Sequence, residues 1–458
     1  MLAKLLGPDL FAVNSLSSQL LMVLAFLDLG AMISLRRSLP RTAGDELARL
    51  QLLCVTRKVS LLSYFAGTLI MLFAGIWGHI SGHGQWSLAF LAAGTILPIQ
   101  GTVTFRSAIY TADNKQVRAT SLLLLAAMVN VTVTLACFDI LHEGVIVLGP
   151  AAGFGVALLA DSFTRGATKL PFSLVTSSNF RWLSRYEYRT MFLLCCSQWT
   201  AVALVNLESY FSFVSMSAHD VGCLGLIMNI LVVVSIFPIS LSNQMSPAIN
   251  HANRKQNNHV IIKMLKASRR LLLVLMLAVI LYGTLAFQFL IEWKLPLYVS
   301  VIPTLWIMSI STYLYTVTFY ASSYAMSKDK QNEILSIQIF ALLIQVAMVI
   351  VLVLLDRLTL SLLAWTALAK FVTYHVLQSR ALKRISNGQL GQPVSDIVTT
   401  LVFALPLVAA AYFATNKNVP ALVLVCSGVG AVFIVIGKSS LVLWKEALTT
   451  LRLNLQDL

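Results

Sequence analysis

The stretch Ile334–Leu355 reads ILSIQIFALLIQVAMVIVLVLL and decides the fold class, because its 22 consecutive residues carry no charge. A helix needs about 20 apolar residues to cross the hydrocarbon core of a bilayer. Within hydrocarbon every backbone N–H and C=O needs a partner inside the protein, so only helices and closed barrels can span it. The apolar residues are continuous rather than alternating, which predicts a membrane-spanning helix rather than a barrel strand.

Similar apolar runs recur along the whole chain of 458 residues. Charged residues make up 11% of the sequence, under half of the about 25% that is typical of soluble domains. We therefore predict an all-α polytopic membrane protein without a soluble domain. The thirteen predicted spans are residues 10–35, 59–79, 86–110, 119–141, 144–162, 190–214, 222–244, 271–291, 297–326, 334–355, 358–377, 397–415 and 419–437.

The basic residues predict the orientation of these spans. Of the 33 Lys and Arg residues, 27 fall in the C-terminal tail and in the loops on the same side of the membrane. Cytoplasmic loops carry such an excess, so we expect a cytoplasmic C-terminus and an N-terminus on the other side. The net charge of +15 follows mostly from this asymmetry, and no nucleic-acid partner is needed to explain it.

The ionisable residues Lys370, Arg106 and Glu208 lie within predicted spans, Asp28 lies near the inner end of the first span, and Asp161 and Asp139 lie close to span ends. Such residues are costly in a bilayer and mark functional sites. Lys370 is the best candidate for contact with an anionic group, and Arg106 either shares this role or extends its side chain to the inner headgroups. Glu208 pairs with a basic residue or titrates as a proton carrier. Asp28 is a candidate for coupling or gating, or holds a helix end.

Polar residues at helical spacing predict polar faces on several spans. Those of the first span are Asn14, Ser18 and Asp28, and Gln338 and Gln345 share a face of the tenth. The ninth span carries the longest stripe, which consists of Ser309, Tyr313, Thr316, Tyr320 and Ser323. Interhelical hydrogen bonds explain short stripes, at about one kcal/mol per contact. For the five-residue stripe we favour a water-filled path, in which the tyrosines contact sugars.

Signatures of enzymes are absent from the sequence. It has no P-loop, no HExxH and no GxSxG, and its six cysteines form no CxxC pair or Cys/His cluster. We predict neither a metal nor another cofactor, and coupling to protons or sodium stays open. A membrane glycan polymerase or ligase would be expected to carry a large external loop, whereas the predicted external loops are short. These features argue against an enzyme.

The first predicted span closely resembles one family. Leu6-Gly7-Pro8-Asp9-Leu10-Phe11 precedes an apolar run that ends in Leu27-Asp28-Leu29-Gly30 and Arg36-Arg37. This pattern resembles the polysaccharide transporter family, in which "LGPxxFG" precedes the second transmembrane helix and "LDLG" with basic residues closes it. That family is the flippase branch for O-antigen and exopolysaccharide repeat units within the multidrug/oligosaccharidyl-lipid/polysaccharide exporter superfamily.

The resemblance implies a fold of two six-helix bundles around a central cavity, here followed by two further helices. It implies export of an undecaprenyl-diphosphate-linked oligosaccharide across the bacterial inner membrane. Cationic cavity residues would attract the diphosphate, and we assign this part to Lys370 and Arg106. Asn14, Ser18, Tyr313, Thr316, Tyr320 and Ser323 are our candidates for the sugar and polar part of the cavity. A polysaccharide polymerase and a chain-length regulator are candidate partners beside membrane lipids.

The expected lobes are residues 1–162 and 190–379, joined by a basic cytoplasmic linker at 163–189. Residues 397–437 would form the two further helices and residues 438–458 a cytoplasmic tail. Two other functions stay open beside the flippase: a multidrug/cation antiporter of the same superfamily, and a scaffold or remnant that no longer transports. The antiporter would want acidic groups deep in the cavity, for which Glu208 is the good candidate.

In that family one helix precedes "LGPxxFG", whereas this chain starts at that loop. We hypothesise that the first helix is missing through a misassigned start or a degraded gene. The upstream reading frame tests the first explanation: an in-frame apolar segment before Met1 is the expected result. In-frame stop codons directly before Met1, with no apolar segment, would exclude a misassigned start.

Overall fold

The computed structural model describes residues 2–24, 45–81, 84–113, 115–141, 145–164, 185–254, 258–328, 330–390 and 393–437, with single positions 32, 35, 39 and 442 besides. Every regular element among them is a helix. The chain divides into two compact units, one formed mainly by residues 4–203 and the other by residues 204–458. The division falls within helix α7 (Arg185–Ser215) rather than in the predicted linker, and the lobe bounds inferred from the sequence stay a prediction.

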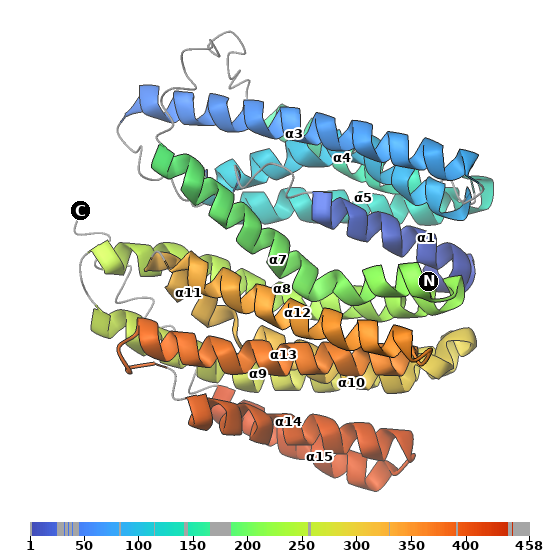
Figure 1. Ribbon diagram of the computed structural model, residues 1–458, viewed down its shortest axis with the longest axis vertical. Coiled ribbons are helices and arrows are strands. Elements are labelled where there is room, and N and C mark those ends of the chain that lie inside the picture. Colours follow the sequence, from blue (N-terminus) through green and yellow to red (C-terminus); the bar gives the residue numbers. More distant parts are fainter. Residues whose placement is uncertain are drawn as a thin grey trace. The chain divides into compact units, whose positions relative to one another are not determined.

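The N-terminal unit contains five helices besides the start of α7. They are α1 (Leu2–Leu24), α3 (Glu46–Ile80), α4 (Gly84–Ala112), α5 (Gln116–Leu141) and α6 (Val145–Thr164). Helix α3 packs along α4, and α5 packs along α6, as Figure 1 shows in blue and cyan. Helix α4 also contacts α5 and α6 and so joins the two pairs.

The C-terminal unit is built around α13 (Leu360–Ile385), which packs on α10 (Ile302–Thr316) and on α12 (Gln331–Leu354). Two long helices, α8 (Ala218–Arg254) and α9 (Asn258–Lys294), complete this core with the short helix α11 (Phe319–Ser327). The 3-10 turn η5 (Pro296–Val301) leads from α9 into α10. The hairpin of α14 (Pro393–Thr415) and α15 (Val419–Val432), continued by the π-helical turn η6 (Phe433–Gly437), lies against α9.

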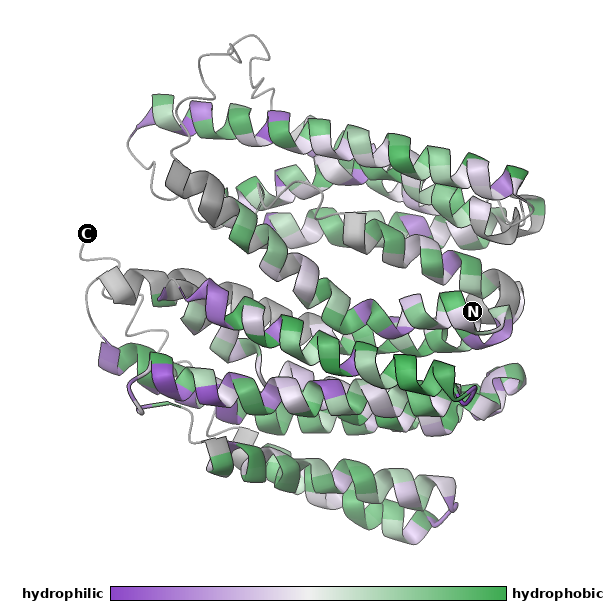
Figure 2. Ribbon diagram, in the orientation of Figure 1, coloured by the Kyte–Doolittle hydropathy of each residue, from purple (hydrophilic) through white to green (hydrophobic). Residues whose placement is uncertain are grey.

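The prediction of an all-α polytopic membrane protein is confirmed. Within the described residues, nine helices are long and apolar enough to cross a bilayer, and two shorter ones are also apolar. Figure 2 shows hydrophobic residues along nearly every helix. On α3 the side chains of Phe65, Phe73 and Trp77 are each more than 60% exposed. A soluble monomer rarely exposes large apolar patches, so these side chains face the hydrocarbon.

Two segments that the sequence analysis assigned to loops are helical instead. Residues 46–58 belong to α3, and only residues 255–257 separate α8 from α9 in the predicted link 245–270. The 37 residues of α9 extend over about 55 Å, well beyond the about 30 Å of hydrocarbon. Charge marks where a helix leaves the membrane, but Lys, Arg and Glu are good helix formers and do not by themselves end a helix. The charged segments therefore continue as helix.

The "LGP" motif interrupts the first helix. Gly7 has φ 69° and ψ 172°, a conformation that is open to glycine and strained for other residues. Pro8 follows it and lacks the N–H that would continue the helical hydrogen bonds. The motif that carries the family resemblance therefore has a physical function, because it introduces a break near the start of α1.

Glycines set the close approach between helices of the N-terminal unit. A Cβ added to Gly153 on α6 would lie 2.3 Å from the backbone oxygen of Ala126 on α5, and one added to Gly101 on α4 would lie 2.5 Å from the Tyr64 ring on α3. Small residues let helix backbones approach in a bilayer, where apolar burial against lipid gains little. Gly153 is the stricter position, since a backbone oxygen cannot rotate away.

We predict that Gly153→Ala lowers the free energy of unfolding by about 1–3 kcal/mol, because the added methyl group must push α5 and α6 apart. Thermal unfolding of the full chain in detergent micelles measures the change. Gly155→Ala is the matched control on the same helix, since its Cβ would meet no atom within 4 Å. Equal stabilities of the two variants would contradict the proposed backbone contact.

Candidate functional site

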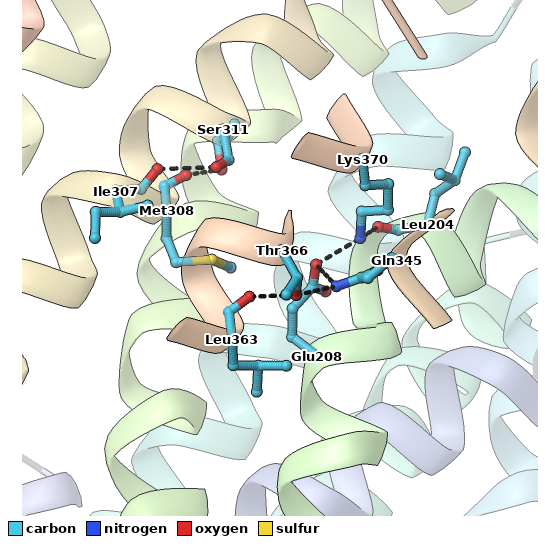
Figure 3. Close-up of polar contacts among 10 residues, drawn as sticks. Leu204, Glu208, Ile307, Met308, Ser311, Gln345, Leu363, Thr366 and Lys370 are labelled. Carbon is cyan, nitrogen blue, oxygen red and sulfur yellow. Dashed lines mark hydrogen bonds and ion pairs between the residues drawn. The ribbon is translucent and has the colours of Figure 1, made fainter. Parts of the chain in front are cut away.

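A buried ion pair lies at the centre of the C-terminal unit. Lys370 Nζ on α13 is 2.5 Å from Glu208 Oε1 on α7, and both side chains are fully buried (Figure 3). The ammonium also donates a hydrogen bond to the backbone oxygen of Leu204, one turn earlier on α7. Removing two charges from water costs several kcal/mol per ion, so a buried pair needs good geometry and further hydrogen bonds.

Polar side chains from two helices support this pair. On α12, Gln345 Nε2 donates to Glu208 Oε1 at 2.8 Å and lies 3.5 Å from Thr366 Oγ1 on α13. Thr366 in turn donates to the backbone oxygen of Leu363 at 2.7 Å. The Lys370 ammonium lies 4.4 Å from the centre of the Phe371 ring, a cation–π distance. Helices α7, α12 and α13 are thus held together by one polar cluster.

Two buried acceptor atoms of the cluster stand out among the described residues. Glu208 Oε2 and Gln345 Oε1 are buried and have no hydrogen-bond partner among the residues that the structure describes. Most buried side-chain polar atoms in proteins are paired, and an exception calls for an explanation such as a bound ion or water.

The structure places the Lys370 ammonium in a buried ion pair. We expected it to contact an anionic group, and in this structure it is fully buried and pairs with Glu208. Of the two alternatives for Glu208, the structure shows pairing with a basic residue. The physical reason is that two opposite charges within a bilayer lower the free-energy cost of burying each other when they pair. This arrangement does not provide a direct contact between Lys370 and a diphosphate, which stays a prediction.

The polar stripe of the ninth span is packed rather than open. It is divided between α10 and α11 by a turn at Val317 and Thr318. The Tyr313 hydroxyl donates to the backbone oxygen of Leu273 at 3.2 Å, and Thr316 Oγ1 donates to the backbone oxygen of Tyr313.

The stripe is buried in this structure, and the expected water-filled path stays a prediction. Ser309, Tyr313, Thr316 and Tyr320 are all buried, so the stripe makes contacts between helices in this structure. The Ser323 side chain lies outside the described part. The proposed contacts with sugar stay a prediction.

Arg106 belongs to a charged cluster in the N-terminal unit. Its Nη1 atom lies 2.8 Å from Asp161 Oδ2 on α6 and also bonds the hydroxyl of Ser162. Arg118 on α5 reaches Asp161 Oδ1 at 3.6 Å, and the Tyr110 hydroxyl donates to the same oxygen. Two guanidinium groups therefore share one carboxylate. Arg106 Nη1 therefore pairs inside the protein. The depth of Arg106 within its predicted span did not distinguish this pairing from extension of the side chain to the headgroups.

The candidates on the first span are only partly described. Ser18 is exposed and donates to the backbone oxygen of Asn14 at 3.0 Å, while Asn14 is half-buried. Asp28 lies outside the described residues, so its predicted part in coupling or gating stays a prediction.

The sequence analysis missed Thr366 and gave Gln345 no part in the site. Both positions carry a signal, since Thr366 precedes Lys370 by one helical turn and Gln345 repeats the position of Gln338 after seven residues. Asp161 was noted as an ionisable residue close to a span end, but the sequence did not indicate Arg106, 55 residues earlier, as its partner.

The fold is similar to that of two solved transporters. One is described as the inward-facing conformation of a multidrug resistance MATE family transporter of the MOP superfamily. It matches 84% of this chain and 92% of its own, with a TM-score of 0.66 and 15% identity. The other is the eukaryotic MATE transporter AtDTX14, with a TM-score of 0.54, 13% identity, and coverage of 85% of this chain and 97% of its own. No family model and no curated protein matches the sequence.

We predict that breaking the buried pair is strongly destabilising. Lys370→Met and Glu208→Leu should each lower the free energy of unfolding by about 3–5 kcal/mol, because each leaves an uncompensated buried charge. The double variant should regain most of this loss, since it replaces both charges by apolar groups. Thermal unfolding in detergent micelles of the four proteins gives the coupling energy.

The pair between Arg384 on α13 and Glu333 on α12, in the same unit, provides a control. Its atoms are 3.6 Å apart and the Arg384 side chain is 73% exposed, so we expect little coupling in the same cycle. Single variants at Lys370 and Glu208 that unfold like the unchanged protein would show that the ion pair does not stabilise the unit.

Proposed function

We propose that this chain is a membrane transporter that moves lipid-linked oligosaccharides, as the resemblance of residues 6–37 implies. The similarity of the fold to MATE transporters supports the transporter class. The motif residues support the branch, since Gly7 and Pro8 produce the break in α1. The substrate would be an oligosaccharide on an undecaprenyl-diphosphate carrier in the inner membrane, with the C-terminus cytoplasmic.

The neutralised carboxylate of Glu208 is the observation that favours this proposal over a cation antiporter. A transporter of cationic drugs wants a buried acid that is free to attract the substrate. Here Lys370 occupies that acid at 2.5 Å, and Gln345 takes a further hydrogen bond to it. Among the described residues of the C-terminal unit, the acid that the antiporter hypothesis relied on is therefore already paired. An anionic substrate does not need it.

The cluster around Asp161 supports an anionic substrate from the other unit. Arg106 and Arg118 together carry two positive charges against one carboxylate, and both side chains are partly exposed. Guanidinium groups bind phosphate oxygens in bidentate fashion. On the predicted orientation this cluster lies towards the cytoplasmic ends of its helices, where a diphosphate headgroup would enter. Asp161 would position the two arginines rather than contact the substrate.

Reconstituted transport tests the proposal. Proteoliposomes that contain the full chain are loaded with an undecaprenyl-diphosphate oligosaccharide bearing a fluorescent sugar, and an external quencher reports its movement between leaflets. We expect faster movement than in protein-free liposomes. Arg106→Gln should lower the rate by about tenfold or more, since a charge-assisted hydrogen bond contributes about 1.5–3 kcal/mol. Arg106→Lys, which keeps the charge, should lower it less.

The same proteoliposomes are tested with a cationic dye in place of the lipid. Proton- or sodium-driven movement of the dye, without movement of the oligosaccharide, would replace this proposal by the antiporter. Movement of neither substrate by correctly folded protein would favour the non-transporting alternative.

A further inference from the structure

The surroundings of the Lys370 ammonium resemble a coordination site for a cation. Its ligands are Glu208 Oε1 and the backbone oxygen of Leu204, which come from the same face of α7 one turn apart. Gln345 from α12 donates to Glu208 Oε1 through Nε2, which also lies 3.5 Å from Thr366 Oγ1 on α13 (Figure 3). Carboxylate and carbonyl oxygens, such as those of Glu208 and Leu204, are ligands that a hard cation prefers.

The unpartnered acceptors point in the same direction. Glu208 Oε2 and Gln345 Oε1 have no partner in the described part of the chain, although both residues are fully buried. A lysine ammonium has only three donors, and here one of its sides faces the Phe371 ring. Pairing with one lysine leaves these two oxygens unused, whereas a coordinated cation takes more than two oxygen ligands. The two unpartnered oxygens therefore agree with a site for a cation.

We infer that Lys370 serves as a built-in cation, which fills an oxygen-lined monovalent cation site between α7, α12 and α13. The chain carries the cation covalently, so this site neither loads nor releases one. A cation from solution then cannot bias the conformation of the unit through this site, because a ligand shifts an equilibrium only by binding one state better. The inference does not depend on which substrate the chain moves.

Removing the tethered cation should create a site for a free one. Lys370→Ala removes four heavy atoms, three carbons and the ammonium nitrogen. The n-propylammonium ion has the same four heavy atoms in the same order. It can therefore restore both the packing and the charge, whereas 1-propanol restores only a neutral chain of similar shape. Choline is a cation of similar charge that is too bulky and has no N–H donors for Glu208 and Leu204.

The test is thermal unfolding of the full chain in detergent micelles at constant ionic strength. In n-propylammonium chloride, Lys370→Ala should unfold about 2–4 °C higher than in choline chloride once the ligand is about fivefold above its Kd. The unchanged protein should unfold at the same temperature in both salts, and 1-propanol should give no rise. The double variant Lys370→Ala/Glu208→Gln should lose the response, since the carboxylate is gone.

An equal response of Lys370→Ala to propylammonium and choline would overturn the inference. If Lys370→Ala does not fold in choline chloride, the same membranes are solubilised in propylammonium chloride. Folded protein recovered only with propylammonium supports the built-in cation. Failure in both salts, together with a folded Lys370→Met, would show that the position needs a long side chain rather than a cation, and would equally overturn it.

Discussion

The charge of Lys370 has to be compensated within the protein, because the residue is fully buried in a unit built from apolar helices. Glu208 provides this compensation from a helix that lies 162 residues away in sequence. The pair fixes α7 against α13, and Gln345 adds α12 to the same network. In hydrocarbon, apolar contacts between helices gain little over contacts with lipid, so a polar network of this kind has a large share in deciding which helices pack together.

Both units use polar contacts between helices, and the N-terminal unit adds close approach at glycines. In the N-terminal unit, Gly101 and Gly153 allow close contact, while Arg106 on α4 and Arg118 on α5 pair with Asp161 on α6. In the C-terminal unit, buried polar side chains bond one another across the helices, as Thr284 and Ser309 do at 2.8 Å. The stripe on α10 takes part in such contacts, since Ser309 accepts from Thr284 and the Tyr313 hydroxyl donates to the backbone oxygen of Leu273.

The charges of the two units bear on the proposed substrate. The buried acid of the C-terminal unit is neutralised by Lys370, whereas Asp161 in the other unit receives two arginines. The lipid-linked diphosphate that we propose as substrate agrees with the basic loops on the side predicted to be cytoplasmic. The built-in cation that we infer would occupy the Glu208 site from within. If the proposed transport uses a driving ion, that ion would then act elsewhere.

The sequence by itself determined the fold class, since runs such as Ile334–Leu355 have no stable place except a bilayer. It also indicated the special backbone at Gly7, because glycine followed by proline has a local meaning that does not depend on the fold. It identified Lys370, Glu208 and Arg106 as unusual. The free-energy cost of an ionisable side chain in hydrocarbon depends on its depth along a single helix, which the sequence shows. Only the tertiary structure decided that Lys370 meets Glu208 and that Arg106 meets Asp161. Those pairings depend on how helices distant in sequence pack, and no single-helix pattern contains that information.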